Sequence, residues 1–377
     1  TLGFDALHVG LIATTTLLGS ALLTLAVGLV GIRLPARALL IGAAVLMTTT
    51  GLGFAAFESF WPLVLVAFVG TLNPSAGDVS VFLPLEHAVL ARSVGAADRT
   101  ALFARYSLVG SLMGAVGALL VAVPELLTAY LSFAPPTALR LMFVVYALTG
   151  LAAALLYRRL PAETVQVGKV QAPALGPSRG IVLKLAALFS FDAFAGGLVV
   201  QSLLALWLFE RFGLSQTATA QLFFWSGLLT ALSYLLAVPL AKRIGLVNTM
   251  VFTHLPANLC LCAVPFVPEL WQAIVLLLVR ALLSQMDVPT RQSYTLALVA
   301  PDERSAASGI TNIARSMGAA LSPLLSGLLL ANPLLVNAPL FLAGGLKIVY
   351  DLLLYRRFRA LKPPEETAGA GRNPERR

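Results

Sequence analysis

Residues 285–291 read Gln-Met-Asp-Val-Pro-Thr-Arg and place Asp287 and Arg291 one helical turn apart inside a long apolar stretch. An ionised side chain costs roughly 2.5–3.5 kcal/mol at the centre of a bilayer, so such residues line an aqueous cavity or pair with each other. The charged residues within apolar stretches of this chain are Asp78, Asp192, Arg280, Asp287, Arg291, Arg315, Lys347 and Asp351. Their chemistry is ion pairing, proton exchange or the recognition of a charged solute.

The stretches that hold these residues are membrane helices by length and composition. The chain is 58% hydrophobic and only 11% charged, whereas a soluble domain carries roughly 25% charged residues. Apolar runs of about 20 residues recur along it, and each is long enough to cross a bilayer. The sequence therefore predicts an all-α membrane protein with eleven spans, at about 8–31, 37–56, 60–88, 100–124, 136–157, 183–209, 216–241, 247–266, 270–299, 306–331 and 334–355.

A polar loop that contains Pro and Gly, residues 158–182, divides these spans into helical halves at 1–157 and 183–360. The tail 361–377 has no apolar face to bury and is expected to be disordered. When the central loop is placed in the cytoplasm, nearly all Lys and Arg outside the spans fall on the cytoplasmic side. This positive-inside asymmetry explains the net charge of +9 without a nucleic-acid partner. It predicts a cytoplasmic C-terminus in a cell membrane, the bacterial inner membrane.

The two halves share a repeat. Arg33 and Arg243 are 210 residues apart, as are Arg105 and Arg315, and Asp78 and Asp287 are 209 apart. Duplicated halves are typical of secondary transporters, whose binding site lies between them. At this offset the span 183–209 has no partner in the first half. We therefore expect a twelve-helix protein whose first helix is missing from this sequence, with one wall of the central cavity open and no transport by this fragment alone.

Two loops at equivalent places carry a family motif. They read "GLVGIRLPAR" at 28–37 and "VPLAKRIGLV" at 238–247. Both are similar to the loop Gly-x-x-x-Asp-Arg-x-Gly-Arg-Arg of the major facilitator superfamily, with Ile32 and Lys242 in place of the acid. The chain resembles that family over nearly its whole length. The resemblance implies two six-helix halves, cytoplasmic termini and transport by alternating access.

A Gly-rich stretch, "GAALSPLLSG" at 318–327, is also similar to a motif of antiporter members of the family. Close packing of small residues between helices explains it equally well.

The repeat relates two acids and two bases, because Asp78 and Asp287 precede Arg105 and Arg315 by 27 or 28 residues. We expect these four to form a charge network, either one that breaks as the cytoplasmic gate opens or one that holds each half together. Arg291 joins the network or reaches the interface by snorkelling. Lys347 and Asp351, four residues apart on the last span, are expected to neutralise each other. His254 is expected to be a packing residue.

Two residues break the two-fold pattern. Asp192 lies among small residues in the span 183–209, with Gln201 further along, and Arg280 corresponds to Thr71 in the first half. Both are predicted to face the central cavity near the membrane midplane. There Arg280 would hold an anionic or polar group of the substrate, and Asp192 would take up the coupling proton. The alternatives are a hydrogen-bonded structural Asp192 and a structural bridge between the two.

The sequence contains no phosphate-binding loop, no nucleophile–base arrangement and no metal-ligand spacing. An enzyme and a cofactor are therefore not expected. The prediction is a monomeric secondary active transporter in the lipid bilayer that moves a small organic solute, coupled to protons or another cation, in the direction of export. The alternative is a facilitator of the same fold in which the charges only gate.

Overall fold

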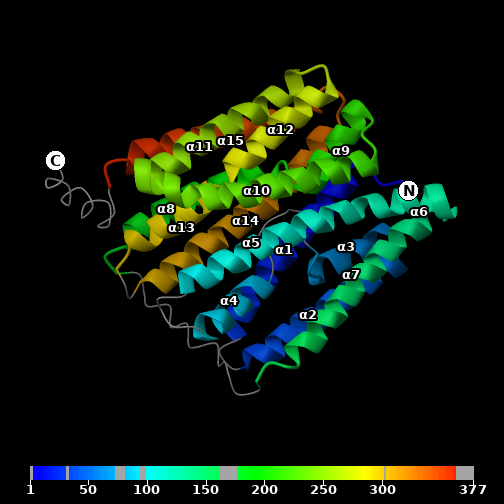
Figure 1. The fold of residues 1–377 in the computed structure, drawn as a ribbon, viewed down its shortest axis with the longest axis horizontal. Helices are drawn as coiled ribbons and strands as arrows, with labels where there is room; N and C mark the ends of the chain where they lie inside the picture. The colour runs from blue at the N-terminus through cyan, green and yellow to red at the C-terminus, as the bar shows by residue number, and fades with distance from the viewer. Residues whose placement is uncertain are drawn as a thin grey trace.

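The computed structural model describes residues 3–30, 34–72, 81–93, 99–161, 176–300 and 303–361, and the regular elements in these ranges are helices (Figure 1). Those of the first half are α1 (Ala6–Val30), α2 (Ala36–Ala56), α3 (Phe60–Val69), α4 (Phe82–Ser93), α5 (Arg99–Leu119), η2 (Leu120–Ala122), α6 (Val123–Leu131) and α7 (Pro135–Tyr157). Those of the second half are α8 (Arg179–Gly197), α9 (Gln201–Phe212), α10 (Gln216–Ile244), α11 (Leu246–Ala263), η3 (Val264–Phe266), α12 (Leu270–Ser284), α13 (Asp287–Ala297), α14 (Arg304–Leu330) and α15 (Ala338–Phe358).

Ten helical segments within the described ranges are long and apolar enough to cross a membrane. The predicted span 60–88 is described only as α3 and α4, on either side of residues 73–80, so the count of eleven is not confirmed. Two other predicted spans are each divided into two helices, α8 with α9 and α12 with α13. Most of the predicted central loop and nearly all of the tail, residues 162–175 and 362–377, lie outside the described residues.

Helix packing repeats between the halves. The 210-residue offset carries α1 onto α10 and α5 onto α14, and α1 packs against α14 as α10 packs against α5 (Figure 1). In the same way, α2 packs against α7 and α11 packs against α15. The repeat predicted from single residues thus extends to pairs of helices, and the α1–α14 and α5–α10 contacts join the two halves.

Small residues allow α14 to approach its neighbours closely. A Cβ atom added at Gly10 of α1 would lie 2.8 Å from the Cα of Gly327 and 2.7 Å from the carbonyl oxygen of Pro323. A Cβ at Gly318 would lie 2.3 Å from the carbonyl oxygen of Ser190 on α8. The stretch 318–327 therefore serves as a packing surface on two sides, as small residues commonly do between membrane helices.

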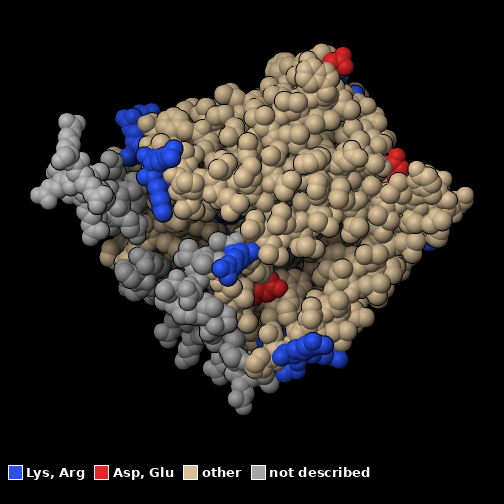
Figure 2. Space-filling view, in the orientation of Figure 1, with Lys and Arg blue, Asp and Glu red and all other residues tan. Residues whose placement is uncertain are grey.

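Hydrogen bonds connect the two halves. They lie toward one end of the bundle, and most basic residues lie at the other end. Glu125 Oε2 of α6 accepts bonds from the backbone N–H of Thr217 (2.7 Å) and from its hydroxyl (2.8 Å) at the start of α10. The backbone N–H of Leu324 donates to Thr14 Oγ1 across the α1–α14 contact (2.7 Å). We call the opposite end, where α7 and α10 finish and α8 begins, the basic end. Figure 2 shows Lys and Arg gathered toward that end and a hollow between the halves.

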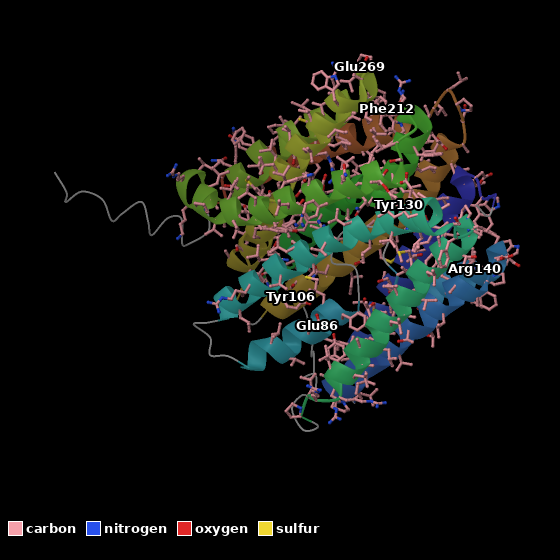
Figure 3. All side chains as sticks on the ribbon, turned by 45° about the vertical axis from the view of Figure 1, so that its right-hand side comes forward. Glu86, Tyr106, Tyr130, Arg140, Phe212 and Glu269 are labelled. Carbon is pink, nitrogen blue, oxygen red and sulfur yellow. The ribbon has the colours of Figure 1, made fainter. Side chains whose placement is uncertain are left out.

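Figure 3 shows Arg140, Glu269 and Phe212 at the far end of the bundle from Glu86 and Tyr106. In the first half, Glu86 of α4 accepts hydrogen bonds from the hydroxyls of Tyr106 on α5 and Tyr157 on α7. One carboxylate thereby links three helices near the basic end.

Candidate functional site

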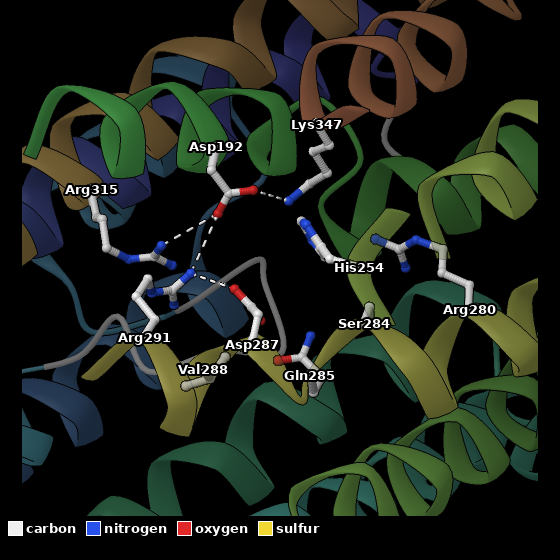
Figure 4. Close-up of a pocket in the computed structure, with 10 residues that line it drawn as sticks. All are labelled: Asp192, His254, Arg280, Ser284, Gln285, Asp287, Val288, Arg291, Arg315 and Lys347. Carbon is white, nitrogen blue, oxygen red and sulfur yellow. Dashed lines mark hydrogen bonds and ion pairs between the residues drawn. The ribbon is translucent and has the colours of Figure 1, made fainter. Parts of the chain in front are cut away.

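Asp192 lies at the centre of a buried charge cluster in the second half (Figure 4). α8 packs between α14 and α15, and Asp192 faces them with only 4% of its surface exposed. Its Oδ1 is 2.6 Å from Lys347 Nζ of α15. Its Oδ2 is 3.4 Å from Arg315 Nη1 of α14 and 3.6 Å from Arg291 Nη1 of α13. One carboxylate therefore holds cations from three different helices.

Residues 285–291 contain the break between α12 and α13. Pro289 has no N–H to donate to the carbonyl of Gln285, four residues earlier, so a regular helix cannot pass through this point without losing a bond. Instead, the N–H of Val288 bonds that carbonyl in a tighter turn (3.3 Å). Asp287 becomes the first residue of α13, where the helix dipole favours a carboxylate. Its Oδ2 accepts a 2.6 Å hydrogen bond from Arg291 Nη1.

Arg291 joins Asp287 to Asp192 and is itself buried, with 6% of its surface exposed. Its guanidinium also lies 5.4 Å from the ring centre of Phe189 on α8. This cation–π contact adds to the ion pair with Asp192 in fixing α13 against α8, whereas the pair with Asp287 lies within α13. Arg291 thus belongs to the network and does not snorkel to the interface.

A second buried group adjoins the cluster on α11 and α15. His254 Nδ1 is 2.8 Å from Asp351 Oδ1, and Asn258 Nδ2 donates to Asp351 Oδ2 (3.0 Å). Asp351 is fully buried and His254 is 4% exposed. The prediction that Lys347 and Asp351 neutralise each other is wrong, because Lys347 pairs with Asp192 and Asp351 contacts His254 instead. His254 is likewise part of a polar group and not only a packing residue.

These side chains surround a cavity of about 90 Å³ (Figure 4). It is lined by Asp192, His254, Arg280, Ser284, Gln285, Asp287, Val288, Arg291, Arg315 and Lys347. Arg280 is the cation here that lacks a partner in the described part of the chain, and its Nε is buried without a hydrogen bond. The described lining therefore includes four permanent cations against two carboxylates.

A second cavity of about 210 Å³ lies where the halves meet. Its walls are mainly apolar and come from α1 and α2, from Leu72, and from Ser202 near the start of α9. The hydroxyl of Ser202 is buried without a partner in the described structure. This cavity offers a mainly apolar surface with two hydroxyl groups, of which that of Thr16 is bonded to the carbonyl of Ile12.

The structure brings together five of the predicted site residues, Asp192, Arg280, Asp287, Arg291 and Arg315. Asp192 and Arg280 share one cavity and form no direct ion pair, so the structural bridge between them is not observed. Gln201 lines neither of the two cavities. Arg105 is exposed on α5, and Asp78 lies outside the described residues. Arg315 pairs with Asp192, whereas Asp287 pairs with the neighbouring Arg291.

Sequence reasoning did not place His254 and Asn258 in the cluster, and it gave Lys347 the wrong partner. His254 and Asn258 are four residues apart on an apolar helix, and this i, i+4 spacing places both on one face. A polar pair on one face of a membrane helix was the available signal. The partner of Lys347 carried no such signal, because Asp192 is 155 residues away.

A further carboxylate anchors the loop that precedes α14. Glu303 accepts hydrogen bonds from the backbone N–H groups of Gly176 and Ser178, the latter at 3.2 Å. Hydrogen bonding by Ser178, and then by the backbone of Gly176, lowers the pKa of Glu303 from its ordinary value. Its charge therefore ties the start of the second half to the loop between α13 and α14.

The sequence profile of the Major Facilitator Superfamily matches residues 185–376, just over half of the chain. An uncharacterised membrane protein of Saccharomyces cerevisiae is 23% identical over 353 residues, which cover 84% of this chain and 79% of the yeast protein.

Solved structures with this fold include three transporters. The D-xylose-proton symporter has a TM-score of 0.73 at 15% identity, covering 93% of this chain and 87% of that one. The nucleoside transporter NupG has a TM-score of 0.69 at 15% identity, covering 94% and 91%. The human organic anion transporter MFSD10 has a TM-score of 0.64 at 18% identity, covering 92% and 83%. The chain is a membrane transporter, not an enzyme, and it belongs to the Major Facilitator Superfamily.

Proposed function

We propose that the protein is a secondary active transporter of a small organic solute and that proton binding at Asp192 is coupled to its movement. The observation that carries this proposal is the set of contacts of one buried carboxylate, which is bound by Lys347, Arg315 and Arg291. A proton on Asp192 cancels the charge that attracts all three cations. Since these cations belong to α15, α14 and α13, protonation weakens the contacts of three helices with α8 in one step.

This arrangement suits alternating access, in which the helices of the two halves move around a fixed site. A proton can shift a conformational equilibrium only if it binds one state better than the other. Here the state with Asp192 paired to three cations favours the ionised carboxylate. A state in which α14 or α13 has moved away loses those pairs and favours the protonated form. The gate predicted from the repeat consisted of Asp78, Arg105, Asp287 and Arg315, with Arg291; in this proposal Arg291 and Arg315 act through Asp192 instead.

The described conformation has its cross-half hydrogen bonds away from the basic end, at Glu125–Thr217 and at Thr14–Leu324. We place the basic end in the cytoplasm, because cytoplasmic segments of membrane proteins carry the excess of Lys and Arg. The cross-half hydrogen bonds then lie toward the opposite side of the membrane. We propose a monomer as the working unit, because the binding site of a transporter with duplicated halves lies between the two halves of one chain.

The structural relatives support movement of a small organic solute, since the solutes in their names are a nucleoside, D-xylose with protons, and organic anions. The second candidate is a facilitator of the same fold. It is favoured if the contacts of Asp192 are purely structural, since a carboxylate with three permanent partners has no need of a proton.

The test uses the full-length protein in liposomes that contain the dye pyranine, which reports internal pH. Solutes are added in turn, and a proton flux that depends on both solute and protein is expected. Asp192→Asn should abolish the proton flux, and Asp192→Glu should keep part of it. Arg357→Gln, an exposed change in the last turn of α15 at the basic end, is the matched control.

A solute flux without proton flux in the unchanged protein would establish the facilitator. An undiminished proton flux in folded Asp192→Asn would exclude Asp192 as the coupling site. The same liposomes also test export. A pH gradient is imposed across their membrane, and the side on which the solute accumulates gives the direction of net transport.

A further inference from the structure

We propose that the transported solute is an organic anion whose charged group binds beside Arg280, and that this group competes with Asp192 for Lys347, Arg315 and Arg291, so that anion and proton bind together. The substrate class and its site follow from the cavity alone. The link to the proton rests on the coupling proposed above.

The first observation is the charge of the cavity. Its described lining carries four permanent cations, Arg280, Arg291, Arg315 and Lys347, against the carboxylates of Asp192 and Asp287. The nearby Asp351 is paired with His254 and Asn258. Removing a charge from water costs several kcal/mol unless a partner compensates it. A site with surplus positive charge inside a membrane protein gains most from an anionic ligand.

The second observation is the position of the surplus. Arg291, Arg315 and Lys347 all contact a carboxylate, whereas Arg280 contacts none in the described structure. Its Nε is shielded from solvent and lacks a hydrogen-bond acceptor. Buried polar atoms of side chains nearly always have a partner. A planar guanidinium presents paired donors that match a carboxylate or a phosphate, so the missing acceptor fits an oxyanion.

The third observation is size. The cavity measures about 90 Å³, whereas pockets that enclose a drug-sized molecule measure roughly 300–1,000 Å³. The cavity therefore admits a charged group of a few atoms, and the remainder of the solute extends out of it. Figure 4 shows Arg280 and Asp192 on opposite sides of the same space, with Lys347 and His254 between them.

The sign of the link follows from the shared cations. An anion that binds Lys347 or Arg315 withdraws part of the positive charge that keeps Asp192 ionised. Asp192 then binds a proton more readily, and by reciprocity a protonated Asp192 leaves those cations free for the anion. Anion and proton therefore favour each other's binding, which is the condition for their transport in the same direction.

The first experiment measures binding by the purified full-length protein in a neutral detergent. Benzoate and succinate are the probes, and benzamide and succinamide are their uncharged counterparts. We expect the anions alone to bind. Arg280→Gln should weaken binding roughly 10- to 150-fold, as expected for a hydrogen bond to a charged group. Arg280→Lys should retain part of the affinity, and Arg357→Gln should retain all of it.

Equal binding of the uncharged probes, or unchanged affinity in folded Arg280→Gln, would overturn the anion site. Phosphatidylglycerol added to the detergent tests a lipid head group as the source of the anion. Binding of that lipid without binding of either soluble anion would overturn the proposal as well.

The second experiment follows pH during binding in weakly buffered solution. We expect net proton uptake on anion binding, as positive linkage requires, and none in Asp192→Asn. Proton release would overturn the linked part of the proposal. Anion binding without any proton exchange would leave the anion site intact and refute the proposed coupling instead. Transport of uncharged solutes together with protons would refute the anion site and leave the proposed coupling intact.

Discussion

The ion pair between Asp192 and Lys347 should be the most strongly coupled contact in the second half. Both residues are buried, at 4% and 8% exposure, and their charged atoms are 2.6 Å apart. The pair also joins α8 to α15, and its two residues are 155 positions apart in the chain. We consider Asp192→Asn, Lys347→Met and the variant that combines them.

Removing one partner of a buried ion pair typically costs about 3–5 kcal/mol, because the other charge stays buried without compensation. The unfolding entropy is about 2.1 cal/mol/K per residue, or about 0.8 kcal/mol/K for 377 residues. Each single change should therefore lower the melting temperature by about 4–6 °C. In the double variant, neither lone charge of the pair remains. The double variant should lose less stability than the two single variants together, by about 1–3 kcal/mol. This difference corresponds to about 1–4 °C in melting temperature.

The assay is tryptophan fluorescence of the detergent-solubilised protein during heating. Arg315→Gln is the graded comparison, because the Arg315 side chain is 30% exposed and 3.4 Å from Asp192, and its loss should cost less than that of Lys347. Asp192→Asn combined with the exposed change Arg357→Gln should be additive. Strict additivity of the Asp192 and Lys347 changes would refute the idea that this contact stabilises the second half as a pair.

Three further changes have defined outcomes. Gly10→Leu should obstruct the α1–α14 contact and lower transport at least tenfold, whereas Gly42→Leu, whose Cβ would meet no atom within 4 Å, should leave the transport rate unchanged. Asp287→Arg should abolish transport, and Arg291→Asp in the same chain should restore part of it; recovery only with a partner other than residue 291 would contradict the observed pair. Glu303→Gln should lower the melting temperature at pH 7, and the difference from the unchanged protein should shrink as pH falls below 4.5.

The sign of the Glu303 effect follows from its pKa. Hydrogen bonds lower the pKa of Glu303 in the folded protein below the ordinary value of 4.5. Its contribution to stability is therefore complete above the pKa of the unfolded chain and is lost as pH falls toward the lowered folded value. A melting-temperature difference between the unchanged protein and Glu303→Gln that stays constant from pH 7 to pH 4 would exclude this assignment.

Much of the fold could be predicted from the sequence, because a bilayer leaves few choices. Apolar length sets which segments span the membrane, and backbone hydrogen bonding requires them to be helical. The repeat of Arg33, Asp78 and Arg105 at 209 to 210 residues then indicated two related halves. The breaks within two spans were missed, although Pro289 gave a local signal for one of them. The other break, after Gly197, is stabilised by a tertiary bond, from Ser326 Oγ to the carbonyl of Leu198 (2.7 Å).

The membership of the site was easier to predict than its pairing. A charge in an apolar helix is visible in the sequence, and Asp192, Arg280 and Asp287 were identified on that basis. Which charges meet depends on the rotation and packing of helices, which one sequence does not encode locally. The i, i+4 rule correctly describes the spacing of Lys347 and Asp351, yet both side chains find buried partners on other helices. Local pairing of exposed charges is weak, and a stronger tertiary contact replaces it.

The asymmetry of the site is the clearest link between this structure and transport. Helix contacts repeat between the halves, but the surroundings of Arg280 and Arg315 do not. The first-half counterpart of Arg280 is Thr71, whose hydroxyl forms a 3.0 Å hydrogen bond with Tyr146, and the counterpart of Arg315 is the exposed Arg105. A cycle between two conformations requires halves that pack alike, whereas recognition of a solute requires a place where they differ. We therefore propose that α8 and α11–α15 recognise the solute and that the first half provides the surface against which they move.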